Sequence, residues 1–185
     1  IPKEPIFPDL TSGPAFNAVQ WAATMRIIEG RDGLFHPKEQ ISRAQFAVIL
    51  HRYAGRPNVS STVSFTDVTP GTTIGRAVAW AVDKGITSGR SSTVFGINDI
   101  ISRELMMVML YNYHTKVDNG SGGASANALA RFTDRGDVLA GALNAMRWAV
   151  ENGLLTGQGG KILPKASMTR DQLVTILYRY DKVFN

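Results

Sequence analysis

Three arginines in this chain recur in one sequence setting that could bind an anion. Each of them directly follows a Ser or a Thr, in the pairs Ser42-Arg43, Ser102-Arg103 and Thr169-Arg170. Ser and Thr are strong N-cap residues, so each Arg is expected at the first position of a helix. A guanidinium beside the free N–H groups of a helix N-terminus could receive one carboxylate or phosphate. An equally weighted alternative is a structural ion pair with a carboxylate of a neighbouring unit.

The three arginines close three copies of one sequence pattern. Each copy opens with an aromatic-x-Asp motif and carries a Trp in its middle (Phe7, Asp9 and Trp21; Phe65, Asp67 and Trp80; Phe132, Asp134 and Trp148). From Asp to Trp the step is 12, 13 and 14 residues, and from Trp to Arg it is 22, 23 and 22 residues. These repeats divide the chain into 1–56, 57–118 and 119–185. We expect them to form one compact domain, because a unit of about 60 residues has a thin core of its own. The three aspartates are the candidate partners for structural ion pairs.

Each unit is expected to fold as a helix, a loop and a second helix. Apolar residues at helical spacing predict first helices near 15–29, 75–84 and 139–152. The second helices are expected to begin at the capping Ser or Thr and to bury an i, i+3, i+4, i+7 stripe. Gln45 and Gln172 would complete capping boxes, whereas Leu105 would not.

The segment between the two helices carries one apolar residue in register. Phe35, Phe95 and Ile162 each lie eight residues before the Arg, which predicts a buried side chain beneath the second helix. Glycines follow the first helices, where the chain must take a positive φ. Polar linkers at 55–64 and 116–126 separate the units. The sequence therefore indicates an all-α domain of three helix-loop-helix repeats.

Composition and charge narrow the possible partners. The 185 residues carry a net charge of +5, which favours anionic partners, but the Lys and Arg are dispersed, so nucleic acid is not expected. No apolar run approaches the roughly 18 residues of a membrane helix, so membrane insertion is not expected. The chain has no Cys, and His36, His51 and His114 share no register or ligand spacing. We therefore expect no metal and no other cofactor.

Catalysis by this chain is not expected either. The sequence lacks a G-x-S-x-G motif and a Walker loop. The aspartates of the aromatic-x-Asp motifs recur by repeat symmetry, which argues against one unique acid–base pair.

The ordered set of motifs resembles three tandem S-layer homology repeats, from about Phe7 to Tyr180. That family's pattern starts with Phe-x-Asp, continues with a mid-helix Trp, a Gly-Ile-x-x-Gly loop and Phe-x-Pro, and closes on Thr-Arg-Ala-Glu. Here the closing motifs read Ser-Arg-Ala-Gln at 42–45, Ser-Arg-Glu-Leu at 102–105 and Thr-Arg-Asp-Gln at 169–172. The resemblance implies one pseudo-three-fold domain around a central bundle of three helices, one from each repeat.

The resemblance also implies a function: a non-covalent anchor in the bacterial cell wall or S-layer, outside the cell. Grooves between repeats would bind an anionic secondary cell wall polymer, linked to peptidoglycan, at a terminal sugar such as N-acetylmannosamine with a pyruvate ketal. The implied binding residues are Arg43, Arg103, Arg170, Ser42, Ser102, Thr169, Gly30, Gly89, Gly157, Trp21, Trp80, Trp148, Asp9, Asp67 and Asp134. A core position for the tryptophans and a turn role for the aspartates stay open as alternatives.

The three repeats depart from the family pattern to different degrees. Leu105 replaces the motif's Glu, and Gly96-Ile97 replaces x-Pro, so repeat 2 is expected to be the least competent. We expect one or two binding grooves rather than three equal ones. Replacing Arg43 by Ala is expected to weaken binding and to leave the fold intact. The alternative function is a helical-repeat protein-interaction module in which the motif arginines make structural ion pairs.

Overall fold

The computed structural model describes residue 2 and residues 4–185, so the start of the first expected repeat lies partly outside the described residues. The described chain forms six α-helices: α1 (Phe16–Thr24), α2 (Arg43–Tyr53), α3 (Thr73–Asp83), α4 (Arg103–Lys116), α5 (Leu143–Glu151) and α6 (Arg170–Phe184). Two short 3₁₀ helices, η1 (Arg135–Asp137) and η2 (Ala140–Ala142), precede α5. None of the described helices has the length and hydropathy to cross a membrane. The same residues contain isolated β-bridges but no strand, which confirms the all-α class.

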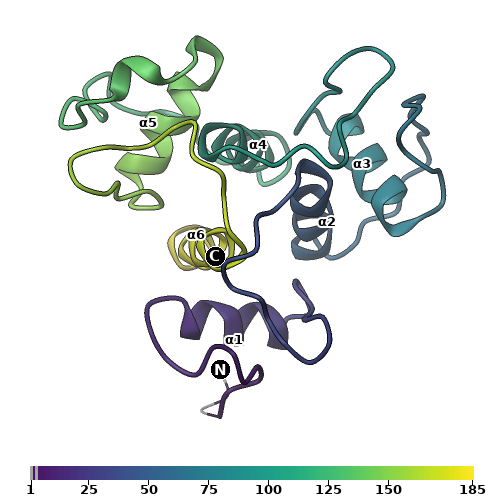
Figure 1. The fold of residues 1–185 in the computed structure, drawn as a ribbon. Coiled ribbons are helices and arrows are strands. Elements are labelled where there is room, and N and C mark those ends of the chain that lie inside the picture. The colour runs from purple at the N-terminus through teal and green to yellow at the C-terminus, as the bar shows by residue number, and fades with distance from the viewer. Residues whose placement is uncertain (1, 3) are drawn as a thin grey trace.

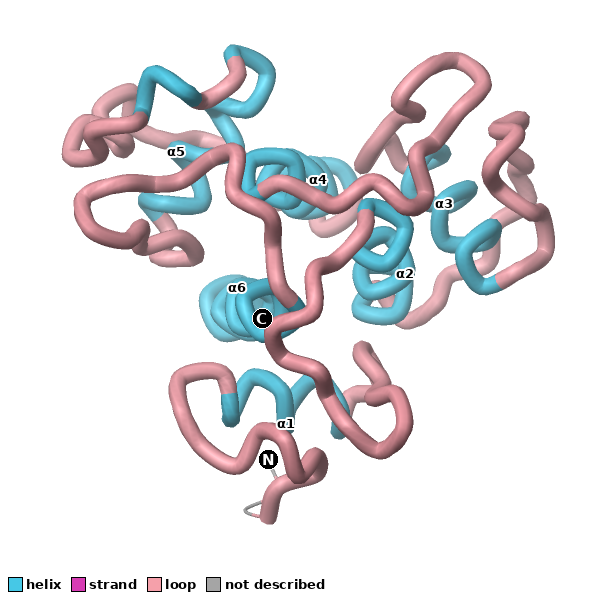
Figure 2. The backbone as a smooth tube through the Cα atoms, viewed as in Figure 1, coloured by secondary structure: helices cyan, strands magenta, loops and turns pink. Residues whose placement is uncertain are grey.

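The helices occupy two kinds of place in the fold. The second helix of each repeat (α2, α4 and α6) lies near the centre, and the first helices (α1, α3 and α5) lie outside them (Figure 1, Figure 2). Each outer helix and its loops form an arm, which we define as arm 1 (residues 4–40), arm 2 (57–99) and arm 3 (124–166). The arms radiate from the central helices, as the resemblance implied for a pseudo-three-fold domain.

Each central helix packs most closely against the outer helix of the next repeat, and not against its own. Thus α2 packs on α3, α4 packs on α5, and α6 returns to pack on α1. The last of these contacts joins the first and last repeats and closes the ring of arms (Figure 1). Each repeat therefore buries the apolar face of its central helix against the outer helix of the next repeat, an arrangement that we call partner exchange.

A ring of backbone hydrogen bonds joins the three segments that lead into the central helices. The N–H of Ile41 donates to Met168 O at 3.0 Å, the N–H of Met168 donates to Ile101 O at 3.1 Å, and the N–H of Ile101 donates to Ile41 O at 2.8 Å. These residues each lie two positions before a motif Arg. The ring holds the three helix N-termini together at the centre of the fold.

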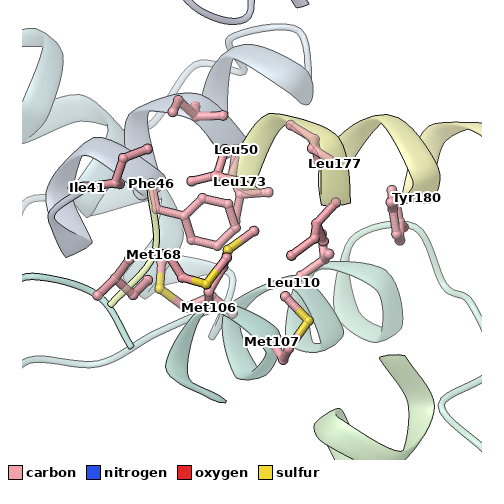
Figure 3. Packing of buried hydrophobic residues seen from close by; sticks show 14 of the residues in the cluster. Ile41, Phe46, Leu50, Met106, Met107, Leu110, Met168, Leu173, Leu177 and Tyr180 are labelled. Carbon is pink, nitrogen blue, oxygen red and sulfur yellow. The ribbon is translucent and has the colours of Figure 1, made fainter. Parts of the chain in front are cut away.

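The core lies among the central helices, where the expected apolar stripes meet. Figure 3 shows large side chains from all three helices packed against one another, and each of the following is fully buried: Phe46, Leu50, Met106, Leu110, Leu173 and Leu177. One helical turn further on, the rings of Tyr53, Tyr113 and Tyr180 meet pairwise at centroid distances of 5.9, 6.0 and 6.1 Å. The predicted stripe is therefore confirmed in all three repeats.

The starts of the central helices agree with the capping residues in the sequence. Ser42, Ser102 and Thr169 are the N-cap residues of α2, α4 and α6. The capping boxes expected with Gln45 and Gln172 are present, and α4 lacks the box because Leu105 has no side-chain acceptor.

The outer helices are shorter than expected in repeats 1 and 3. Helix α1 ends at Thr24 because Arg26 takes a positive φ of 54°, and the N–H of Ile27 then bonds to Ala22 O at 2.9 Å. This is the bonding pattern of a helix that stops at a left-handed residue. In repeat 3, the expected first turn is instead the 3₁₀ helix η2, and α5 begins at Leu143.

Candidate functional site

The three motif arginines lie where one repeat meets the next, and their backbone N–H groups are used in this contact. Arg43 N donates to Asp99 O at 2.9 Å, Arg103 N donates to Ala166 O at 2.9 Å, and Arg170 N donates to Glu39 O at 3.0 Å. The side chains and backbone of adjacent residues satisfy further N–H groups of the same turns. Most of the helix N–H groups that were expected to be free for an anion are therefore used within the fold, and their contact with an anion stays a prediction.

The Arg43 side chain is held by arm 2. Its Nη2 donates to Ser88 O at 2.7 Å, and its guanidinium lies over the ring of Phe95, 4.8 Å from the centroid. Only 9 % of the residue is exposed. Hydrogen bonds and a cation–π contact thus tie α2 to the loop of the next repeat.

The Arg170 side chain makes the corresponding contacts with arm 1. Its Nη2 donates to Glu29 O at 2.7 Å, its Nε donates to Phe35 O at 2.8 Å, and its guanidinium lies 4.9 Å from the Phe35 ring centroid. Arg170 therefore also joins two repeats through backbone acceptors and an aromatic ring.

Arg103 differs from both of its counterparts. Its side chain donates no hydrogen bond to the residues that the structure describes, whereas Arg43 and Arg170 each donate to a backbone oxygen. The Nε of Arg103 is buried without a partner there, as is the Nε of Arg43. The residue of the facing repeat that corresponds to Phe95 and Phe35 is Ile162. Burial lowers the pKa of Arg103, and no carboxylate opposes that shift, whereas Asp99 opposes it at Arg43. None of the three motif arginines forms an ion pair with the described residues, so the alternative of structural ion pairs is not supported.

Arg103 lines a groove of about 440 Å³ between arm 3 and arm 1. Its other lining residues come from α6 (Asp171, Gln172, Thr175, Ile176 and Arg179), arm 3 (Leu154, Leu155, Thr156, Gly157, Gln158, Ile162 and Leu163) and arm 1 (Leu10, Ser12, Pro14, Ala15 and Lys38). We call this cavity the Arg103 groove. It combines apolar walls with hydrogen-bonding groups and cations, a composition that suits a small polar ligand.

Two further cations line the Arg103 groove. Arg179 donates from Nη1 to Leu154 O at 3.2 Å, and Lys38 Nζ lies 2.6 Å from Asp171 Oδ2. Asp171 is the one acidic residue of the lining, and Lys38 already pairs with it. Arg103 and Arg179 therefore leave the groove with a positive balance. The repeat pattern of the sequence did not point to Lys38 or Arg179, because neither recurs in all three repeats.

The aspartates of the aromatic-x-Asp motifs bind backbone N–H groups of their own repeat. Asp9 accepts from Phe35 N at 2.8 Å and from His36 N at 2.7 Å, and Asp134 accepts from Ile162 N and Leu163 N at 2.8 Å each. Asp67 accepts three such bonds, from the N–H groups of Phe95, Gly96 and Ile97. Each Asp thus holds the loop that carries the buried apolar residue, in line with the turn alternative. Contact of any of them with a ligand stays a prediction.

The loop glycines allow close packing within each repeat. A Cβ at Gly30, Gly89 or Gly157 would overlap the Phe ring of the aromatic-x-Asp motif and a backbone carbonyl oxygen (the rings are Phe7, Phe65 and Phe132). Of the three, Gly157 also lines the Arg103 groove. The space beside these glycines is therefore occupied by protein, and a ligand contact stays a prediction for Gly157.

The tryptophans belong to the core. Trp80 and Trp148 are at most 1 % exposed, and Trp21 is 8 % exposed between Tyr53 and Tyr178. Buried rings offer no surface to a sugar, so an apolar wall made by Trp80 and Trp148 is ruled out. The Ser or Thr before each motif Arg serves as a helix cap, and its contact with a ligand stays a prediction.

The S-layer homology domain family matches this chain at residues 6–47, 64–104 and 131–174, which together make up more than half of it. The chain therefore belongs to the S-layer homology domain family, and the resemblance stated from its motifs is confirmed. Membership supports a role in attachment to the cell surface. The domain boundaries expected from the repeat spacing stay a prediction.

Three known proteins are similar to nearly the whole chain. The surface-layer 125 kDa protein of Lysinibacillus sphaericus is 30% identical over 91% of this chain, which covers 14% of that protein. The amylopullulanase of Thermoanaerobacterium thermosulfurigenes is 25% identical over 93% of the chain, and exoglucanase XynX of Acetivibrio thermocellus is 25% identical over 95%. The chain spans 9% and 16% of these two enzymes, so it corresponds to a small part of each relative.

Proposed function

We propose that this domain attaches a protein to the bacterial cell wall by binding an anionic secondary cell wall polymer, linked to peptidoglycan, at a pyruvylated terminal sugar. The observation that carries the proposal is Arg103, which lines the groove and makes no side-chain hydrogen bond with the described residues. A pyruvate ketal carries a carboxylate, and a guanidinium binds a carboxylate through two parallel N–H donors.

The rest of the Arg103 groove is suited to the sugar that would carry this carboxylate. Leu10, Pro14 and Leu163 line the groove, are not buried, and offer apolar surface to a ketal methyl group or to the C–H face of a ring. Gln158 and Gln172 offer amide donors and acceptors to sugar hydroxyl and N-acetyl groups. Arg179 adds a second cation for an anionic glycan.

Arg103 belongs to repeat 2, whose motifs depart most from the family pattern. The unusual Gly96 and Ile97 of repeat 2 belong to the loop that meets Arg43, so they do not bear on the Arg103 groove. The access of a ligand to Arg103 depends instead on repeat 3, which supplies Ile162 where repeats 1 and 2 supply Phe. The competence of this groove thus depends on repeats other than the one that carries the Arg.

We further propose that the domain is itself non-catalytic and acts outside the cell, in the cell wall or S-layer. Two of its relatives are named as enzymes, but the chain corresponds to at most 16% of either protein. Their names therefore fit an anchoring segment attached to catalytic parts that this chain does not contain.

Co-sedimentation with purified cell wall sacculi tests this proposal. The domain should pellet with sacculi that carry the polymer and stay in solution with sacculi from which the polymer has been stripped. Arg103→Gln should lower the bound fraction, with an apparent affinity weaker by at least about tenfold, which is about 1.4 kcal/mol. Arg90→Gln, which removes the same charge from an exposed side chain, is the control. Equal pelleting with both kinds of sacculi would favour a protein partner instead.

A further inference from the structure

Arm 3 contains a second cavity with two arginines in its lining, separate from the Arg103 groove. This cavity of about 250 Å³ is lined by Arg135 of η1, Arg147 of α5 and Asn127 of the preceding segment, together with apolar residues. It shares no lining residue with the Arg103 groove. We call it the arm 3 cavity.

The Arg147 side chain makes no hydrogen bond within the part of the chain that the structure describes. Its Nε is buried without a partner, and none of the ion pairs among the described residues includes it. Arg135 donates one bond, from Nη1 to Phe132 O at 3.2 Å. A buried guanidinium nitrogen without an acceptor is costly, so an acceptor from outside the protein would be favourable.

Among the described residues, no carboxylate lines the arm 3 cavity. Two nearby carboxylates bind backbone N–H groups elsewhere. Glu151, one turn after Arg147, accepts from Ser125 N at 2.6 Å. The Asp134 carboxylate holds the N–H groups of residues 162 and 163. The described lining of the cavity therefore contains two arginines and no acidic residue.

The corresponding positions in the other arms show that the fold does not require an arginine at position 147. The residue before the core Trp is Arg147 in arm 3, Gln20 in arm 1 and Ala79 in arm 2. The Gln20 side chain is satisfied there, since it accepts from Ile6 N at 2.9 Å and donates to Glu4 O at 2.6 Å. Arm 3 thus departs from the repeat pattern by placing an unsatisfied cation at this position.

We propose that the arm 3 cavity binds an oxyanion, a carboxylate or a phosphate group, between Arg135 and Arg147. Guanidinium groups match the planar oxygen pairs of both anions, and two of them share one ligand charge better than either does alone. The Asn127 amide adds a neutral donor at the rim. This site is independent of the wall polymer proposed for the Arg103 groove.

NMR titration of the ¹⁵N-labelled domain at constant ionic strength tests the site, with inorganic phosphate and glucuronate as separate probes. The Arg147 Nε–H signal should shift and saturate with at least one probe, and the stronger of the two identifies the preferred oxyanion. In Arg135→Gln the midpoint of this shift should rise by at least about fivefold, because one of the two charged donors is lost.

Two control variants separate the arm 3 cavity from general charge effects and from the groove. Arg131→Gln removes the same charge from an exposed side chain of arm 3 that does not line the cavity, and Arg103→Gln alters the groove. Both should leave the Arg147 titration unchanged. A shift that does not saturate with either probe, or that weakens equally in Arg131→Gln and Arg135→Gln, would overturn the proposal. Because the test reads one side chain in a folded domain, each variant's spectrum also reports its fold.

Discussion

The three motif arginines occupy the same position in their repeats, yet their side chains lie in different surroundings. Arg43 and Arg170 each donate to a backbone carbonyl of the next repeat and lie over a Phe ring. Arg103 faces Ile162, makes neither contact and lines the groove. The sequence could identify the three arginines as a set, but the partner of each lies in another repeat, so their different roles could not be predicted.

Replacing Arg43 by Gln is expected to destabilise the domain. The variant loses the bond to Ser88 O and the contact with Phe95, so the free energy of unfolding should fall by about 1–3 kcal/mol. This reverses the expectation from sequence that Arg43 can be replaced without harm to the fold. Urea denaturation measures the change, and Arg103→Gln is the matched control, expected within about 0.5 kcal/mol of the parent. Equal stability of the two variants would contradict the distinction between them.

Asp67 should contribute to the pH dependence of stability. Burial acts to raise its pKa, but hydrogen bonds from the N–H groups of Phe95, Ile97 and Gly96 outweigh burial and hold the pKa below its usual value. Because the pKa is lower in the folded chain, the carboxylate stabilises the fold above about pH 3.9, and this stabilisation is lost as the pH falls through the folded pKa.

Asp67→Asn should therefore be less stable at neutral pH and less sensitive to acid. We expect a loss of about 1–2 kcal/mol at about pH 7, since Asn keeps one acceptor oxygen but no charge. Below about pH 4 the stability of the variant should fall less steeply than that of the parent. Unfolding measured across this range gives both quantities. A variant with the parent's acid slope would show that Asp67 is not a source of the pH dependence.

One outer helix ends at a non-glycine residue with a left-handed backbone conformation. The left-handed position after each helix is Gly85 after α3 and Gly153 after α5, but Arg26 after α1. A side chain at positive φ is strained, whereas glycine is not. Arg26→Gly should raise the free energy of unfolding by about 0.5–1 kcal/mol, as thermal or urea denaturation would show. Arg26→Ala keeps the Cβ and should give no such gain; if it does, the removal of the charge, and not the backbone, is responsible.

A central helix meets the arm of the next repeat at three interfaces, and two of these interfaces contain an ion pair beside the motif Arg. Glu104 Oε1 lies 2.5 Å from Lys165 Nζ, and Asp171 Oδ2 lies 2.6 Å from Lys38 Nζ. Both carboxylates are buried, at 4 % and 8 % exposure, while both lysines reach solvent. Each pair joins a central helix to the arm of the next repeat and so stabilises the contact between the two repeats.

The third interface, between α2 and arm 2, has Ala44 and Asn98 at these positions. An ion pair can be introduced there by substitution. Ala44→Asp alone should be destabilising, because it buries a carboxylate without a partner. Adding Asn98→Lys should recover stability, with a coupling energy of about 1–3 kcal/mol in a double-mutant cycle. A coupling energy near zero would mean that this interface differs in geometry from the other two.

At the scale of the elements, the sequence predicted what depends on neighbouring residues. The caps at Ser42, Ser102 and Thr169 act through bonds within one turn, so they could be read directly. The end of α1 could not, because Arg26 gives no sign of a left-handed residue. The start of α5 was also misplaced, since a 3₁₀ turn has nearly the same apolar spacing as an α-helix.

At the scale of the whole molecule, partner exchange decides where a ligand can bind. Because α4 packs on α5 and α6 packs on α1, the Arg103 groove is built from all three repeats. Periodicity within one repeat shows which face is apolar, but not which helix covers it. The number of repeats and the all-α class could therefore be predicted from the sequence, whereas the position of the groove required the packing.

Calorimetric titration with a short pyruvylated N-acetylmannosamine ligand, beside the same ligand without its ketal, would show whether Arg103 binds the ketal carboxylate. We predict binding that requires the ketal, that weakens by at least about tenfold in Arg103→Gln, and that occurs at one site per domain. An unchanged affinity in Arg103→Gln would contradict the assignment of the groove. Equal binding of both ligands, or binding of neither, would contradict recognition of the ketal carboxylate.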